Sequence, residues 1–175
     1  TPGPSFLELK MRSLLIQALE YYRRRDTQST QDLPAPLYPM FQMTSVYNDE
    51  EIAGAYEEYR QSPLLRELID AADIDITRVE TGVQPMIAAF THSDQGRPKD
   101  IFRHAFGQEG ETLPLPGGHG QNFQMLRDVY RRLYEQGKRF VYLGNVDNLG
   151  FTVDPVSVAY LALTGKQAGF DFSFR

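Results

Sequence analysis

The stretch F-V-Y-L-G-N-V-D-N at residues 140–148 decides the fold that we expect for this chain. Its first four residues, Phe140–Leu143, form a continuous apolar run, which is typical of a strand buried on both faces of a parallel sheet. Polar side chains follow directly, where the strand would end. Ligands of open parallel sheets bind beyond the carboxyl ends of the strands. We therefore expect a ligand site at Gly144–Gly150.

Helical patterns surround this run. Apolar residues recur at helical spacing over residues 121–136, and Gly137 is expected to end that helix. Asp154 and Pro155 have the pattern of an N-cap followed by a first-turn proline, and Gly165 is expected to end the helix that they begin. The order strand, helix, strand, helix, strand predicts an α/β fold with a mainly parallel sheet and flanking helices.

Further elements are expected in chain order: a helix capped by Ser5, a strand at 37–45, a helix from Asn48 or Asp49 to Tyr59, a short helix opening at Pro63, a strand at 74–80, an extended segment at 86–90, a long loop at 92–116, and a half-buried strand at 170–174. We predict one catalytic domain over residues 1–175. The chain begins with Thr1 instead of Met and ends directly after a strand-like run, so we expect this domain to be truncated.

Composition excludes several classes of function. The 175 residues include no cysteine, which rules out disulfides, thiolate metal sites and a thiol nucleophile. A net charge of -5 argues against a broad nucleic-acid surface, and no apolar run is long enough to span a membrane. The lack of cysteine fits a reducing compartment, so we expect a cytoplasmic protein. No feature of the sequence indicates the oligomeric state.

The P-G-G-H-G segment at 116–120 has the first pattern that can carry chemistry. Gly117 and Gly118 let the backbone approach a ligand closely, and the segment leads into a helix whose free N–H groups favour an anion. His119 can donate a hydrogen bond to a phosphate oxygen. The alternative is a flexible turn with a solvated histidine, and glycine-loop chemistry alone does not separate the two.

The N-V-D-N segment at 145–148 has the second pattern. Asp147 is a suitable oxygen ligand for Mg²⁺, which needs one or two protein carboxylates when a substrate supplies phosphates. An extended backbone would place Asn145 and Asp147 on the same side. The alternative is an Asx-type turn after a strand. Because the two segments flank one helix and one strand, we expect them to meet at one ligand.

Other polar residues carry weaker signals. The paired donor and acceptor of Gln84 could read the edge of a base, although a polar residue before Pro85 is also typical of a plain turn. His92 and His104 lie in the long loop without suitably spaced metal-ligand partners, so we expect them to face solvent. A P-loop and a G-x-S-x-G motif are both absent.

These segments together resemble the UTP–glucose-1-phosphate uridylyltransferase family, also called UDP-glucose pyrophosphorylases. Its members carry P-P-G-H-G-D, a helix, a strand and N-x-D-N-L-G-x-x-V-D, and the corresponding segments here are Pro116–Gln121 and Asn145–Asp154. Residues 43–50 are similar to the family's M-N-S-F-x-T-D-E segment. The resemblance implies a Rossmann-related, glycosyltransferase-A-like domain.

The resemblance also implies a reaction and a set of roles. A sugar 1-phosphate would attack the α-phosphorus of UTP and release pyrophosphate, with Mg²⁺ as cofactor. It assigns nucleotide binding to Gln84, Gly117 and Gly118, sugar and phosphate binding to His119, Asn145 and Asn148, the metal to Asp147, and catalytic roles to His119 and Asp147.

Three alternatives stay open. The sugar could be N-acetylglucosamine 1-phosphate, although the G-H-G-x and N-x-D-N-L-G details favour glucose 1-phosphate. The chain could instead be a non-catalytic nucleotide-binding or scaffold domain. A metal-dependent glycosyltransferase would carry D-x-D where this chain has Asn145-Val146-Asp147.

The chain departs from the family pattern in ways that predict its activity. Gly117 replaces the second proline of P-P-G-H-G-D, Gln121 replaces its aspartate, and the family's L-x-G-G-x-G-T-x-x-G loop and catalytic lysines are absent. Without that loop, the triphosphate lacks its main backbone cradle. We expect little or no transferase activity from this chain alone in a coupled pyrophosphate-release assay. Turnover comparable with that of a full-length enzyme would contradict this expectation.

Overall fold

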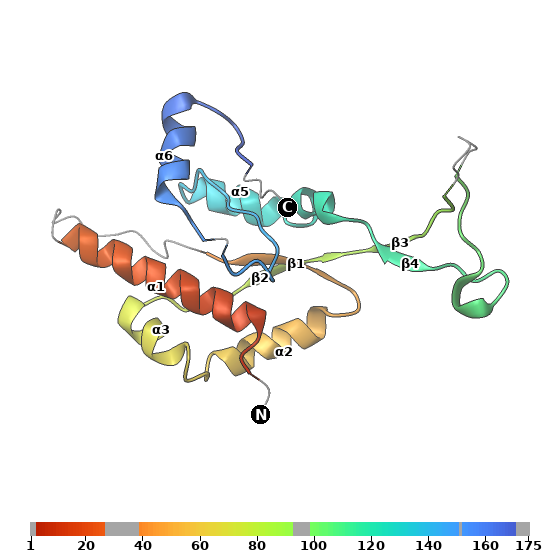
Figure 1. The fold of residues 1–175 in the computed structure, drawn as a ribbon, viewed down its shortest axis with the longest axis horizontal. Coiled ribbons are helices and arrows are strands. Elements are labelled where there is room, and N and C mark those ends of the chain that lie inside the picture. The colour runs from red at the N-terminus through yellow and green to blue at the C-terminus, as the bar shows by residue number, and fades with distance from the viewer. Residues whose placement is uncertain (1–2, 27–38, 93–98, 151, 171–175) are drawn as a thin grey trace. The chain divides into compact units, whose positions relative to one another are not determined.

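The computed structural model describes residues 3–26, 39–92, 99–150 and 152–170 (Figure 1). The chain divides into two compact units, which we describe separately. The first unit comprises Thr1–Tyr38, Tyr59–Ile76 and Gly137–Arg175, and the second comprises Pro39–Glu58 and Thr77–Gln136. Each helix in the described ranges is too short or too polar to span a bilayer.

A parallel pair of strands forms the centre of the second unit. The strands β1 (Phe41–Ser45) and β2 (Glu80–Gln84) pair from Phe41 opposite Glu80 to Ser45 opposite Gln84 (Figure 1). Between them in the sequence the chain forms α2 (Asp49–Tyr59) and, in the first unit, α3 (Arg66–Ala72). The parallel pairing and both helices were predicted correctly. The strand expected at 74–80 was placed too early, because Ile74 and Ile76 are buried in the turns that precede β2.

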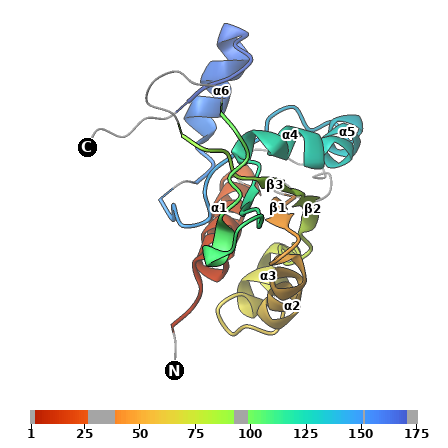
Figure 2. The same cartoon turned by 90° about the vertical axis from the view of Figure 1, so that its right-hand side faces the viewer.

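The helix expected at 121–136 forms in pieces that pack on β2. A 3-10 turn η2 (His119–Gln121) leads into α4 (Asn122–Met125), and α5 (Arg127–Glu135) follows after a break at the fully buried Leu126. A Cβ on Gly82 of β2 would lie only 2.8 Å from Leu126 Cδ2 and 3.1 Å from the Met125 carbonyl oxygen. Glycine at 82 therefore lets α4 lie against the strand, as the turned view shows (Figure 2).

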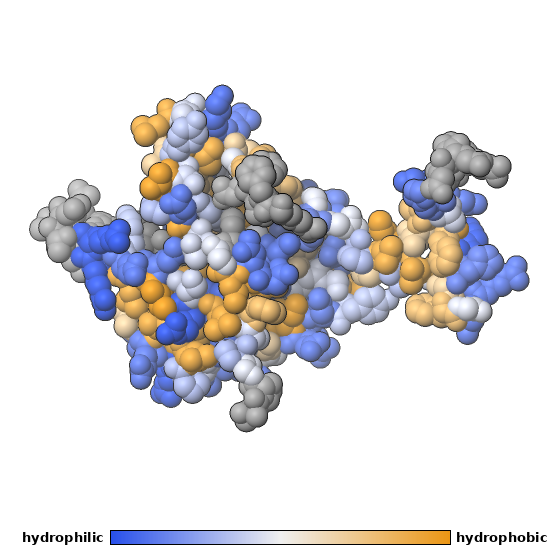
Figure 3. All heavy atoms as spheres, in the orientation of Figure 1, coloured by the Kyte–Doolittle hydropathy of each residue, from blue (hydrophilic) through white to orange (hydrophobic). Residues whose placement is uncertain are grey.

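A short hairpin extends from the end of β2. The strands β3 (Met86–Ala88) and β4 (Pro114–Pro116) pair antiparallel, and Phe90 bridges Ile101 beyond them. The 3-10 turn η1 (Ala105–Gly107) lies between, so part of the expected long loop at 92–116 is ordered. Apolar side chains on this hairpin, including Ile87 and Leu115, are exposed (Figure 3).

Side-chain caps set the first residues of two helices in the first unit. The long helix α1 (Phe6–Asp26) begins after Ser5, whose Oγ accepts a hydrogen bond from the Glu8 N–H at 3.1 Å. It packs against α3 and buries Met11, Leu15 and Ala18. The Asp154 carboxylate accepts hydrogen bonds at 3.0 Å from the Val156 and Ser157 N–H groups and caps α6 (Pro155–Thr164). Both predicted caps are thus confirmed.

The strands expected in the last third of the chain are not observed. Phe140–Leu143 forms no strand, and Phe140, Val141 and Leu143 are 43–49% exposed. Phe170 is also exposed and outside any strand, while residues 171–174 and 37–38 lie outside the described residues. An apolar run becomes a buried strand only when other strands flank it. In the described residues, the only parallel pairing is between β1 and β2. The fold is therefore mixed α/β with a two-stranded parallel sheet.

The close approach at Gly82 predicts a selective loss of stability. Gly82→Ala should lower the free energy of unfolding by about 1–3 kcal/mol, because its Cβ overlaps Leu126 and the Met125 carbonyl. The control is Gly54→Ala in α2, where a Cβ meets nothing within 4 Å. Glycine is unfavourable inside a helix, so this control should gain about 0.5–1 kcal/mol. Urea unfolding measures both, and a neutral Gly82→Ala variant would contradict the packing described.

The Asp154 cap predicts a pH dependence. The hydrogen bond from the Ser157 hydroxyl, followed by those from the Val156 and Ser157 N–H groups, lowers the pKa of the Asp154 carboxyl below its ordinary value. A lowered pKa means that the cap stabilises fully above the pKa of the unfolded chain and is lost as pH falls through the lower folded pKa. We expect Ser157→Ala to raise the Asp154 pKa in a carboxyl NMR titration. An unchanged titration midpoint would show that the hydroxyl is not the main cause.

Candidate functional site

The carboxyl edge of the parallel pair brings two polar segments together in the second unit. Ser45 and Gln84 are direct partners at the ends of β1 and β2. The turn after β1 is held by Asn48, whose Oδ1 accepts hydrogen bonds from the Ser45 N–H at 2.8 Å and the Ser45 hydroxyl at 3.0 Å. Tyr47 in this turn is 70% exposed. This is the edge at which open parallel sheets bind ligands.

Strand pairing carries the glycine-rich segment to the same place. Gln84 ends β2, and Met86, which begins β3, is paired with Pro116 at the end of β4. Gly117 and Gly118 follow Pro116 directly. The three residues predicted to bind the nucleotide, Gln84, Gly117 and Gly118, are therefore neighbours in the fold although they are distant in the sequence. Their roles as ligand contacts stay predictions.

The backbone of this loop is open towards solvent. Gly118 has φ +97° and ψ 165°, a conformation available almost only to glycine, and a Cβ there would meet nothing within 4 Å. The Gln121 N–H donates to the Gly118 carbonyl at 3.1 Å and closes the turn. His119 is exposed at the start of η2. A ligand can thus approach the main chain at Gly118 with the imidazole beside it.

Two glutamine oxygens near this loop have no partner. Gln84 Oε1 and Gln121 Oε1 are both buried, and neither accepts a hydrogen bond from the described residues. Buried polar atoms in native proteins are almost always paired, so an unpaired acceptor needs an explanation such as an external donor. Gln84 was predicted from the sequence to bind the nucleotide, whereas Gln121 was recognised only as a departure from the family motif. No signal in the sequence shows that the Gln121 oxygen is buried.

The N-V-D-N segment lies in the first unit and forms a tight turn. The Asn148 N–H donates to the Asn145 carbonyl at 3.2 Å, and the Leu149 N–H donates to the Asp147 carbonyl at 3.0 Å. The extended backbone that would align Asn145 with Asp147 is therefore not observed, because these hydrogen bonds bend the chain after residue 145. The side chains of Asn145, Asp147 and Asn148 are all exposed.

Polar side chains of α1 hold this segment in place. Lys10, which is buried, donates to the Asn148 carbonyl, and its burial lowers the pKa of its ammonium group. The Gln17 carboxamide accepts from the Val153 N–H at 3.2 Å and donates to the Val153 carbonyl at 3.3 Å. Neither Lys10 nor Gln17 was predicted from the sequence to hold this segment. The available signal was their position directly beside Met11 and Ala18 of the buried stripe.

The predicted metal ligand was compared with what Mg²⁺ requires. Asp147 presents one exposed carboxylate, and the described residues include no group of three or more His, Asp or Glu side chains that could hold a metal. Mg²⁺ commonly keeps several waters and takes one or two carboxylates together with substrate phosphates. A single exposed Asp147 fits that mode of binding. His92 and His104 are exposed, as expected.

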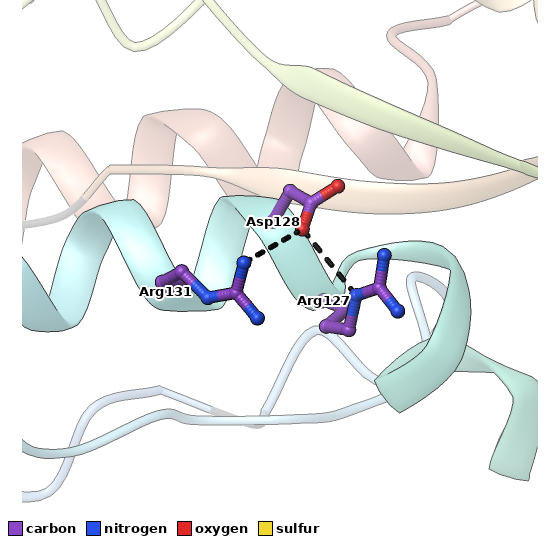
Figure 4. A network of polar contacts seen from close by, with 3 residues as sticks. All are labelled: Arg127, Asp128 and Arg131. Atoms are coloured by element: carbon purple, nitrogen blue, oxygen red, sulfur yellow. Dashed lines mark hydrogen bonds and ion pairs between the residues drawn. The ribbon is translucent and has the colours of Figure 1, made fainter.

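A basic cluster occupies the exposed face of α5. Asp128 Oδ1 lies 3.3 Å from Arg127 Nε and 3.7 Å from Arg131 Nη1 (Figure 4). All three side chains are at least 65% exposed, so these ion pairs contribute little to stability. Two guanidinium groups share one carboxylate, which leaves this helix face with a net positive charge. We interpret it as a solvated face of the helix.

The two predicted motifs fall in different compact units. Residues 116–120 belong to the second unit and residues 145–148 to the first. The meeting of the two motifs at one ligand therefore stays a prediction.

Comparisons with known proteins identify the family. The family model described as UTP–glucose-1-phosphate uridylyltransferase matches residues 77–173. No curated protein and no solved structure matches the chain. The family match includes Gln84, the glycine-rich loop and the N-V-D-N turn. Because it covers more than half of the 175 residues, the chain belongs to the UTP–glucose-1-phosphate uridylyltransferase family, whose members are nucleotidyltransferases.

Proposed function

We propose that this chain supplies nucleotide- and metal-binding residues to an enzyme that transfers a uridylyl group from UTP to glucose 1-phosphate. The family supports the class of reaction and its substrates, UTP and a sugar 1-phosphate. The observation that carries nucleotide binding is the pairing of Met86 with Pro116, which sets Gln84 beside Gly117 and Gly118. The parallel β1–β2 pair supports a Rossmann-related, glycosyltransferase-A-like domain.

The uridine would bind at the carboxyl edge of β1 and β2. The unpaired Gln84 Oε1 suits the N3–H of uracil, which is the hydrogen-bond donor on the base. Gly118 lets the base approach the main chain, since the space beside its Cα is open. Gly117 completes the loop beside it. Together these residues would orient the nucleoside.

The reaction needs positioning and charge neutralisation more than a covalent catalyst. An oxygen of the sugar phosphate forms a bond to the α-phosphorus of UTP. The bond from that phosphorus to the bridging oxygen breaks, and its electron pair leaves with pyrophosphate. The exposed His119 would donate a hydrogen bond to a phosphate oxygen, and the exposed amides of Asn145 and Asn148 would bind the sugar and its phosphate.

Asp147 would hold the metal. Mg²⁺, when bound, would neutralise part of the negative charge on the phosphates. The Asn148 carbonyl is held by Lys10, which would keep the Asp147 turn in a constant conformation.

Two alternatives differ in class. In the first alternative, the enzyme carries out the same reaction on N-acetylhexosamine 1-phosphate. Only the G-H-G-x and N-x-D-N-L-G segments favour glucose 1-phosphate over this substrate. A scaffold role is favoured by the absence of the L-x-G-G-x-G-T loop from the 175 residues. We propose that residues 1–175 belong to one catalytic domain.

The role of Gln84 predicts a loss of binding without a loss of stability. Gln84→Leu removes a buried unpaired oxygen, so its melting temperature should equal or exceed that of the wild type. Its affinity for UTP should fall about ten-fold, which corresponds to about 1.4 kcal/mol, and its preference for UTP over CTP should shrink. The matched control is Gln124→Leu at an exposed position of α4, which should bind as the wild type does.

Isothermal titration calorimetry with UTP, UDP-glucose and UDP-N-acetylglucosamine, with and without Mg²⁺, tests the whole proposal. Tighter binding of UDP-glucose than of UDP-N-acetylglucosamine supports the glucose reaction, and the reverse order supports the alternative. If the wild type binds no uridine nucleotide, the scaffold role is favoured and the proposed function is wrong.

A further inference from the structure

Gln121 lies directly against Gly117. A Cβ built on Gly117 would lie 2.2 Å from Gln121 Nε2, 2.3 Å from Cδ and 2.5 Å from Oε1. The whole carboxamide therefore occupies the space that any side chain at position 117 would need. The backbone of Gly117, unlike that of Gly118 with φ +97°, is not in the left-handed region. A side chain at position 117 would therefore require the flexible end of Gln121 to move.

Gln121 also has an acceptor that the described residues do not use. Its N–H closes the turn onto the Gly118 carbonyl, but its Oε1 is buried and unpaired. Burying an unpaired oxygen is unfavourable, and an apolar side chain of the same length would avoid that cost. This unpaired acceptor belongs to the turn that follows the exposed Gly118, and a donor outside the chain would remove its cost.

We propose that Gln121 is a further nucleotide-contacting residue, whose Oε1 accepts a hydrogen bond from a ribose hydroxyl of the bound nucleoside, because the N3–H of uracil is already assigned to Gln84. This inference rests on the proposed function. Glycine at 117 and glutamine at 121 are the two departures from the P-P-G-H-G-D pattern. Because the two residues are in contact, we treat these departures as one coupled change. A neutral amide accepts from a ribose hydroxyl, and it does not repel the triphosphate as a carboxylate would.

The binding test uses Gln121→Met, which keeps the side-chain length and removes the acceptor. We expect its dissociation constant for UTP to rise about ten-fold while its melting temperature is unchanged or higher, a combination that a purely structural role would not produce. Gln124→Met, in the exposed part of α4, is the matched control. Equal UTP affinity of Gln121→Met and wild type would overturn the inference.

An analogue tests the donor. 2′,3′-Dideoxy-UTP lacks the ribose hydroxyls and should bind equally to the wild type and to Gln121→Met. N3-methyl-UTP, which lacks the donor assigned to Gln84, should still lose affinity on going to Gln121→Met. If dideoxy-UTP loses as much affinity as UTP on going to the variant, Oε1 does not accept from a ribose hydroxyl and the inference is wrong.

A double-mutant cycle tests the contact without a ligand. Gly117→Ala should lower the melting temperature, and adding Gln121→Ala should recover part of the loss, because the overlap is removed. Adding Gln121→Ala to Gly118→Ala should not recover the melting temperature, because the strain at position 118 comes from its positive φ angle. Additive effects of Gly117→Ala and Gln121→Ala would overturn the coupled change. If the cycle shows coupling but the wild type binds no uridine nucleotide, the proposed function and the nucleotide contact are wrong while the coupled pair stands.

Discussion

The contact between Leu126 and Gly82 is the constraint on which the second unit depends. Because strand β2 has no side chain at position 82, the start of the helical segment can lie against it, with Leu126 fully buried. At the other end of the glycine-rich loop that precedes this helical segment, the pairing of Met86 with Pro116 holds the chain in place. The glycine-rich loop is therefore anchored on both sides next to Gln84, at the edge where β1 and β2 end. A loop held at both ends can present its main chain to a ligand in one conformation.

Buried polar groups in the two units serve different purposes. In the first unit, Lys10 and Gln17 reach the backbone of the segment that carries Asp147 and satisfy it, so their burial stabilises the fold. In the second unit, the oxygens of Gln84 and Gln121 are buried without donors. A buried polar group that is hydrogen-bonded stabilises the fold, whereas a buried acceptor without a donor destabilises it until a ligand supplies one. This contrast is the physical basis of our proposal that the second unit binds the nucleotide.

Membership of the uridylyltransferase family adds what geometry alone does not provide, namely the class of reaction. The structure contributes the adjacency of the residues that would bind the nucleotide. Gly117 and Gln121 illustrate how the two kinds of information combine. Each looks like an isolated departure from a motif, yet in the structure the Gln121 carboxamide occupies the place of a Cβ at 117, so a larger residue there would require that side chain to move.

The sequence by itself determined features that depend on residues a few positions apart. The caps at Ser5 and Asp154 were predictable because each interaction closes within one helical turn, and the motifs at 116–120 and 145–148 indicated the family. Only the tertiary structure decided which apolar runs became strands. Phe140–Leu143 has the composition of a buried strand, but that outcome requires partner strands on both sides. The adjacency of Gln84 to Gly117 likewise depends on backbone pairing between distant segments, which periodicity along the chain does not encode.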